Sequence, residues 1–186
     1  MKASDIALVL LAAGRASRFG GGKLAANLAG KPLALHAGER LAAMAFTRKV
    51  LVCSSTTPPI DGFERIQLDP PGAPLSRSIA TGLAAISGTN AVLIALADMP
   101  LVPADHFERL IDAFDGVRIG TLVAGRTMVP AIFGAELFPA LAALEGDRGA
   151  AALLRDAPAI ALEEALALDI DTPDDLARAE ALLQGR

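Results

Sequence analysis

The chain contains one cysteine, Cys53, and neither tryptophan nor tyrosine among its 186 residues. A single cysteine excludes an intrachain disulfide framework and a cluster of thiolate metal ligands. The apolar runs at 6–13 and 91–97 are far shorter than the roughly 20 residues that cross a bilayer, so no membrane association is expected. The first apolar run also comes too early and is too short for a signal peptide, and we expect a soluble, cytoplasmic protein.

Positive charge is not in excess either. The 17 lysines and arginines are outnumbered by 21 aspartates and glutamates, which gives a formal net charge of −4. This balance argues against a nucleic-acid partner, because much of the surface would repel a phosphate backbone. The length suits one domain, 1–186, with a substantial core, and no repeat or linker divides it.

Short apolar runs alternate with helical patterns along the whole chain. The runs at 6–11 and 91–96 are apolar throughout, which is typical of strands covered on both faces. The alternation predicts an α/β fold with a mostly parallel central sheet. His36 and His106 fall within helical patterns, where surface or capping roles are expected. The expected strands are 6–11, 49–53, 65–68, 91–96, 120–123, 131–133 and 167–170, and the expected helices are 32–44, 76–86, 103–114, 135–144, 149–155 and 172–183.

The first expected strand runs into a glycine-rich loop with the sequence LAAGRASRFGGGK at 11–23. Glycines let backbone N–H groups approach a ligand closely, and the cations Arg18 and Lys23 beside them suit a polyphosphate. A P-loop is excluded because the residue after Lys23 is leucine and a serine stands where its first glycine belongs. The dinucleotide fingerprint is excluded because an alanine occupies the second glycine position after Gly14.

The loop resembles the signature of the MobA-like NTP transferases and related nucleotidyltransferases, which runs roughly L-A-A/G-G-x-S-x-R-M/F-G-x-x-K. Ala16 stands where a serine is usual in this pattern. The resemblance implies a three-layer, Rossmann-like nucleotidyltransferase fold whose loop wraps the triphosphate of an NTP, with Arg18 and Lys23 as catalytic cations. The nucleotide-binding residues that it implies in the loop are Leu11, Ala12, Ala13, Gly14 and Gly20.

Carboxylates that could hold a metal ion occur at two other places in the sequence. Asp98 ends the run 91–97 and is expected on the same rim of the sheet as the loop, where it could hold Mg²⁺ as a catalytic ligand. Asp169 and Asp171 share one face if their segment is extended. In similar enzymes a segment of this kind lies at the active site. The resemblance therefore implies that Asp171 is the candidate second Mg²⁺ ligand, with Asp169 lying behind Asp171. The alternatives are that Asp98 caps the helix near 103 and that Asp171 and Thr172 cap the last helix.

Two other segments resemble parts of the molybdenum-cofactor cytidylyltransferases, the closest branch. Ser76 and Ser78 lie in a segment that carries serines near the base in cytidylyl-transferring relatives, with an ordinary helix N-cap as the alternative for either. The segment around Gly146 and Asp147 resembles the L-x-G-D-x-G-A motif, which implies that Asp147 lies on the acceptor side.

The resemblance thus predicts a Mg²⁺-dependent enzyme that moves CMP from CTP to the phosphate of molybdopterin and releases pyrophosphate. No general base is evident, but a phosphate monoester with a second pKa near ~6 is already ionised at neutral pH. CTP is preferred because guanylyl relatives usually carry a second glycine at Ala13. A guanylyltransferase, a transferase for another phosphorylated acceptor, and a non-catalytic protein that delivers nucleotide or cofactor are the alternatives. A molybdoenzyme or its maturation factor is the implied protein partner.

Overall fold

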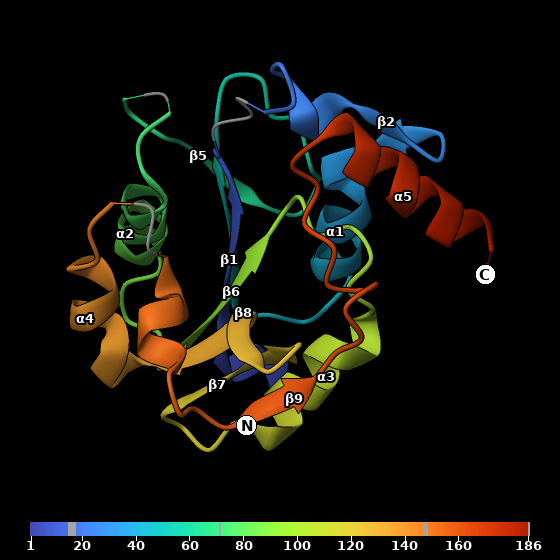
Figure 1. Cartoon of the computed structure of the whole chain (residues 1–186). Coiled ribbons are helices and arrows are strands. Elements are labelled where there is room, and N and C mark those ends of the chain that lie inside the picture. The colour runs from blue at the N-terminus through green and yellow to red at the C-terminus, as the bar shows by residue number, and fades with distance from the viewer. Residues whose placement is uncertain (15–17, 71, 147–148, 186) are drawn as a thin grey trace.

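In the computed structural model, seven strands of the described chain form one central sheet (Figure 1). The structure describes residues 1–14, 18–70, 72–146 and 149–185. The sheet has the order β5-β4-β1-β6-β8-β7-β9, which places β1 in its interior. The strands are β1 (Ala7–Ala12), β4 (Arg48–Cys53), β5 (Glu64–Gln67), β6 (Ala91–Leu96), β7 (Arg118–Val123), β8 (Arg126–Gly134) and β9 (Ala159–Ala161).

The sheet is mostly parallel, as the alternation of strands and helices predicts. β1 pairs in parallel with β4 and β6, β4 with β5, and β7 with β9. Only β8, among the described strands of this sheet, runs antiparallel to its neighbours β6 and β7. The chain places β4 and β5 on one side of β1 and then returns to place β6 on the other. The strand order therefore reverses beside β1, and ligands bind at such switch points in open α/β sheets.

Helices cover both faces of this sheet, which completes three layers (Figure 1). Leu8 and Leu10 of β1 join a buried cluster that includes residues of α1 and α3. Val9 and Leu11, on the opposite face of the same strand, join a second cluster that includes residues of α2 and α4. Burial on both faces explains why an unbroken apolar run forms a strand here. The helices are α1 (Leu33–Ala42), α2 (Leu75–Ala85), α3 (Ala104–Ala113), α4 (Phe138–Ala142) and α5 (Pro173–Gln184), with 3₁₀ turns at Ala3–Asp5, Lys23–Ala25, Ala135–Leu137 and Ala150–Leu154.

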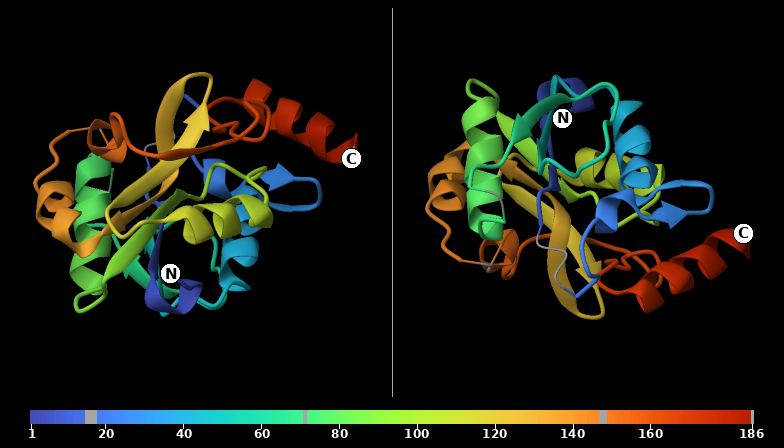
Figure 2. Two further views of the ribbon diagram at one scale, coloured as in Figure 1. Left: turned by 90° about the horizontal axis from the view of Figure 1, so that it is seen from below. Right: turned by 90° about the horizontal axis from the view of Figure 1, so that it is seen from above.

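A smaller unit lies beside α1, outside the main sheet (Figures 1 and 2). It consists of the hairpin formed by β2 (Asn27–Leu28) and β3 (Lys31–Pro32), together with α5. Leu28, Leu33, Ile170 and Ala179 are buried in a third apolar cluster of this unit. Phe19 of the glycine-rich loop packs against the same cluster, so the loop and the C-terminal segment share one small core.

The first four expected strands are confirmed to within two residues at their ends, but the C-terminal third of the chain differs from expectation. The segment 167–170 is not a strand. The Ala167 amide donates to the backbone carbonyls of Glu163 and Glu164, and the Ile170 amide donates to the backbone carbonyl of Asp98. The last strand of the sheet is instead β9, a three-residue segment that pairs with β7. The helix expected at 149–155 is a 3₁₀ turn, and that expected at 135–144 is a 3₁₀ turn followed by the short α4.

The expectation that His106 lies at the surface or caps a helix is wrong, because its side chain is fully buried. Its Nε2 lies 2.8 Å from Thr121 Oγ1, and that hydroxyl donates to the Pro130 carbonyl at 2.7 Å. His36 is half-buried, with Nε2 2.8 Å from the carbonyl oxygen of Leu28. None of the helices in the described chain combines the length and the apolar character that crossing a membrane requires.

Candidate active site

The sequence-predicted site residues gather at the carboxyl ends of β1 and β6. A cavity of about 580 Å³ opens there, a volume in the usual range for small-molecule sites. Four separate segments line it: the end of β1 with the glycine-rich loop, the segment that leads into the first turn of α2, the end of β6, and the segment before α5. The lining residues are Leu11, Ala13, Gly14, Arg18, Lys23, Ala73, Leu75, Ser78, Leu96, Asp98, Asp169 and Asp171.

Consecutive glycines give the loop its path into this cavity. Gly20, Gly21 and Gly22 have φ values of +84°, +102° and +62°, in the left-handed region that residues with a Cβ rarely adopt. Space is not the reason for glycine here, because a Cβ at any of the three would meet no atom of the described residues within 4 Å. Backbone conformation is therefore what these positions require. Gly22 is the residue immediately before the 3₁₀ turn that begins with Lys23.

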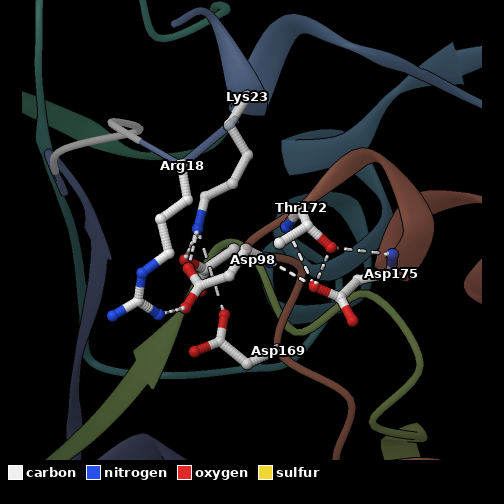
Figure 3. Close-up of polar contacts among 7 residues, drawn as sticks. Arg18, Lys23, Asp98, Asp169, Thr172 and Asp175 are labelled. Carbon is white, nitrogen blue, oxygen red and sulfur yellow. Dashed lines mark hydrogen bonds and ion pairs between the residues drawn. The ribbon is translucent and has the colours of Figure 1, made fainter. Parts of the chain in front are cut away.

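Lys23 lies at the centre of a group of three carboxylates (Figure 3). Its Nζ donates to Asp98 Oδ2 at 2.8 Å and to Asp171 Oδ1 at 3.0 Å, and lies 4.0 Å from Asp169 Oδ1. Only 7% of the Lys23 side chain is exposed. Burial acts to lower the pKa of Lys23, but the charge of Asp98 and the hydrogen bonds to Asp98 and Asp171 outweigh it and raise this pKa. The Lys23 side chain is therefore protonated and positively charged at neutral pH.

Arg18 and Asp169 complete the charged group. Arg18 Nη1 donates to Asp171 Oδ2 at 3.3 Å, and its side chain is 77% exposed. Burial, followed by the negative charge of Asp98, raises the pKa of Asp169 to about 7, while the charge of Lys23 acts in the opposite direction. Both cations that the sequence assigns to a triphosphate therefore contact carboxylates that the sequence assigns to a metal.

A network of hydrogen bonds positions the C-terminal carboxylates. The Ile170 amide donates to the Asp98 carbonyl at 3.0 Å, which fixes this segment against the end of β6. Asp175 Oδ2 accepts from the amides of Asp171 and Thr172 at 3.2 and 2.9 Å and from the Thr172 hydroxyl at 2.7 Å (Figure 3). The Thr172 hydroxyl in turn accepts from the Asp175 amide at 3.2 Å, which forms a capping box at the start of α5.

The capping alternatives are resolved by this geometry. α3 begins after Pro103 without a side-chain cap, so Asp98 does not cap it. Thr172 does cap α5, whereas the Asp171 carboxylate points to Lys23 and Arg18. α2 begins after Pro74 without a side-chain cap, so neither Ser76 nor Ser78 serves as its N-cap.

Some of the expected site residues lie outside the main cavity. Ala12 lines a smaller adjoining hollow, and Gly20 and Ser76 do not line the cavity. Asp147 falls outside the described residues, and so does Ala16, the position at which the loop departs from the family pattern. Sequence reasoning missed Ser54 and Thr56, which line the adjoining hollow. Their position directly after β4, the strand next to β1, is the signal that could have indicated them.

The donor set fits a hard divalent cation. Asp98 Oδ1 is buried and accepts no hydrogen bond from the described residues, so one carboxylate oxygen remains available beside Lys23. Within the described ranges, no three His, Cys, Asp or Glu side chains converge in a metal-holding arrangement. Mg²⁺ does not require three, since it is commonly held by one or two carboxylates together with substrate phosphate oxygens and water.

Comparison with known proteins identifies the family. The model of the MobA-like NTP transferase domain matches residues 8–164, most of the chain. The chain belongs to this family. The transferase is 33% identical to a molybdenum cofactor guanylyltransferase of Cereibacter sphaeroides, over 95% of this chain and 96% of the relative.

Solved structures show the same nucleotidyltransferase fold. A homolog of Mycobacterium tuberculosis Rv0371c, from Mycobacterium sp. strain JC1, superposes on the transferase with a TM-score of 0.85 at 22% identity, covering 98% of both chains. The molybdopterin-guanine dinucleotide biosynthesis protein A of Archaeoglobus fulgidus gives a TM-score of 0.69 at 21% identity, covering 97% of this chain and 100% of the other. The three-layer α/β fold expected from the sequence is confirmed.

Proposed function

We propose that this transferase moves a nucleoside monophosphate from an NTP to the phosphate of a molybdopterin-type acceptor. One observation carries the proposal: Arg18, Lys23 and Asp98 line one cavity at the switch point of the sheet. Cations and a carboxylate in that arrangement suit a metal-bound triphosphate. The acceptor is inferred from the guanylyltransferase relative, which aligns over nearly the full length of both chains.

In this proposal the protein positions two phosphates and neutralises their charge. An oxygen of the acceptor phosphate attacks the α-phosphorus, the bond from that phosphorus to the bridging oxygen breaks, and pyrophosphate leaves. The acceptor needs no general base, because a phosphate monoester is largely ionised at neutral pH. Arg18 and Lys23 bind the triphosphate and stabilise the charge of the leaving group, while the loop backbone orients it. Asp98 and Asp171 would hold Mg²⁺, which supplies further neutralisation of phosphate charge when bound.

Two nucleotides are candidates, and one observation supports each. Ala13 is 3% exposed and contributes to the cavity wall, so its methyl group takes space where guanylyl relatives usually carry a glycine. A narrower pocket there favours the pyrimidine of CTP, which stays our prediction from the sequence. The Cereibacter sphaeroides relative is named a guanylyltransferase, which favours GTP.

Pyrophosphate release with each of the four NTPs, with and without molybdopterin, tests the proposal. Release is expected only with one preferred NTP, with acceptor and with Mg²⁺, and EDTA is expected to abolish it. Asp98→Asn should lower the rate at least about 100-fold, because it removes a carboxylate charge that would hold Mg²⁺ against the reacting phosphates. The matched control is Asp61→Asn, an exposed carboxylate before β5. Nucleotide binding without release under every condition would refute the enzyme and favour a delivery protein.

A further inference from the structure

We propose that Lys23 is an internal counter-ion that occupies the carboxylate group of the nucleotide-free protein, and that a bound triphosphate draws it away so that a divalent cation can bind. Nucleotide and metal would then bind cooperatively through one side chain. The identity of the triphosphate rests on the proposed function, whereas the arrangement of Lys23 does not.

Lys23 and a metal ion compete for the same carboxylate oxygens. The Lys23 ammonium is hydrogen-bonded to Asp98 Oδ2 and to Asp171 Oδ1. These two carboxylates are the candidate metal ligands, and Asp169 Oδ1 is 4.0 Å from the same nitrogen. An ammonium and a divalent cation repel each other strongly at such separations, particularly where little water screens them. Metal binding by both carboxylates therefore requires the ammonium to leave.

The group of carboxylates around Lys23 also has an oxygen that could bind a further cation. Among the described residues, the carboxylates Asp98, Asp169 and Asp171 face the cations Lys23 and Arg18. Asp98 Oδ1 is buried and without a hydrogen-bond partner among the described residues, although a buried carboxylate oxygen is costly to leave unpaired. A divalent cation in place of the ammonium would use this oxygen and bring more positive charge to the group.

The Lys23 side chain can change its position without a movement of the backbone. Its charge sits at the end of a flexible four-carbon stem, and a lysine ammonium is a compact point charge that changes partners readily. Lys23, Arg18 and Gly14 line one continuous cavity, so a triphosphate bound there offers the ammonium an alternative set of anionic oxygens. Asp98 and Asp171 are then released for the metal. By thermodynamic linkage, each ligand raises the affinity of the other.

The test is Mn²⁺ binding to the nucleotide-free protein, followed by electron paramagnetic resonance. Lys23→Met keeps the length of the stem and removes the charge, and it is expected to lower the Mn²⁺ Kd about tenfold or more. Lys23→Arg keeps the charge and should bind Mn²⁺ as weakly as the wild type. An unchanged or weaker Mn²⁺ affinity in folded Lys23→Met would overturn the proposal.

A measurement on the wild type keeps the proposal testable if Lys23→Met does not fold. Saturating Mn²⁺ should raise the labelling rate of Lys23 by an amine reagent, read by mass spectrometry, because the ammonium is displaced from its partners. Lys31, which pairs with Glu39 away from the carboxylate group, is the internal reference and should not change. Mn²⁺ binding without any change at Lys23 would also overturn the proposal.

Neither measurement uses nucleotide or acceptor, so the two proposals can fail separately. If the wild type releases no pyrophosphate but Lys23→Met binds Mn²⁺ more tightly than the wild type, the proposed function is refuted and the counter-ion role of Lys23 is supported. If the wild type releases pyrophosphate but Lys23→Met has no higher affinity for Mn²⁺, the counter-ion role is refuted and the proposed function is supported.

Discussion

At the scale of single residues, His106 shows how a buried titratable group can serve stability instead of catalysis. The Thr121 hydroxyl donates to the Pro130 carbonyl, so His106 Nε2 must be the donor in its contact with Thr121. Nδ1 is buried and has no acceptor among the described residues, so the imidazole is neutral, with its one proton on Nε2. Burial, followed by the charge of Arg109, lowers the pKa of His106 to about 4, and Asp105 opposes this shift.

This arrangement predicts that acid destabilises the protein through His106. An unfolded histidine with a pKa near ~6.5 takes up a proton before the buried one does. The native state therefore loses stability as the pH falls from about 6.5 toward about 4, by up to about 3 kcal/mol. Urea unfolding at several pH values measures the loss, and His106→Gln should flatten it over this range.

His36→Gln is the matched control for the acid effect. The pKa of His36 is also lowered by burial, but its side chain is only half-buried and bonds to the Leu28 carbonyl. The His36 variant should therefore retain most of the pH dependence. An equal slope of stability against pH in the wild type and in His106→Gln would show that His106 does not carry the effect.

At the scale of elements, the start of α5 positions the C-terminal carboxylates. Asp175 accepts the amides of Asp171 and Thr172, so its carboxylate holds the backbone that carries Asp171 toward Lys23. The Thr172 hydrogen bonds, opposed by slight burial, lower the pKa of Asp175, so it is ionised at neutral pH. Asp175 is in this view a positioning residue and does not itself face the cavity.

Asp175→Ala is expected to cost about 1 kcal/mol of stability, the usual value of a helix cap, and to weaken Mn²⁺ binding in the presence of nucleotide. The same substitution at Asp174, an exposed neighbour in the same first turn, is the control and should leave Mn²⁺ affinity unchanged. Melting curves and Mn²⁺ titrations of both variants separate the two effects. A loss of stability alone, with unaltered Mn²⁺ affinity, would assign Asp175 to capping only.

Helices and strands that are determined by their own residues could be predicted from the sequence. Those that depend on contacts with residues far along the chain could not. β1 and β6 are unbroken apolar runs, and the cap at Thr172 with Pro173 after it is a strong helix signal. β9 is only an Ala-Ile-Ala segment, so nothing in it predicts a strand until β7 lies beside it. The position of the site at one edge of the sheet was predictable, because the loop and Asp98 both follow the ends of parallel strands. The contact of Lys23 with Asp171 was not, because 148 residues separate them.

At the scale of the whole molecule, the third apolar cluster connects the glycine-rich loop with the C-terminal segment. Phe19 and Leu24 on the loop side pack against the cluster that holds Ile170 and Ala179. This cluster has fewer buried residues than the two that cover the sheet, and the partly buried side chains that pack against it outnumber its buried members. Small, partly exposed units open more readily than a central sheet. The two segments that carry the cations Arg18 and Lys23 and the carboxylate Asp171 thus belong to the more easily opened part of the fold, whereas Asp98 follows β6 of the central sheet.

Ligand binding should therefore protect this unit as one body. In hydrogen exchange read by mass spectrometry, the preferred NTP with Mn²⁺ is expected to slow exchange of α5 and of the β2–β3 hairpin, because the ligand would bind Lys23 and Asp171, whose two segments pack on one shared cluster. β1 and β6 provide the reference, since their buried amides should exchange slowly with or without ligand. Ala179→Gly, which removes a fully buried methyl group from the cluster without touching the site, should reduce the protection of the hairpin. Protection confined to the glycine-rich loop would mean that the loop and the C-terminal segment respond to the ligand separately.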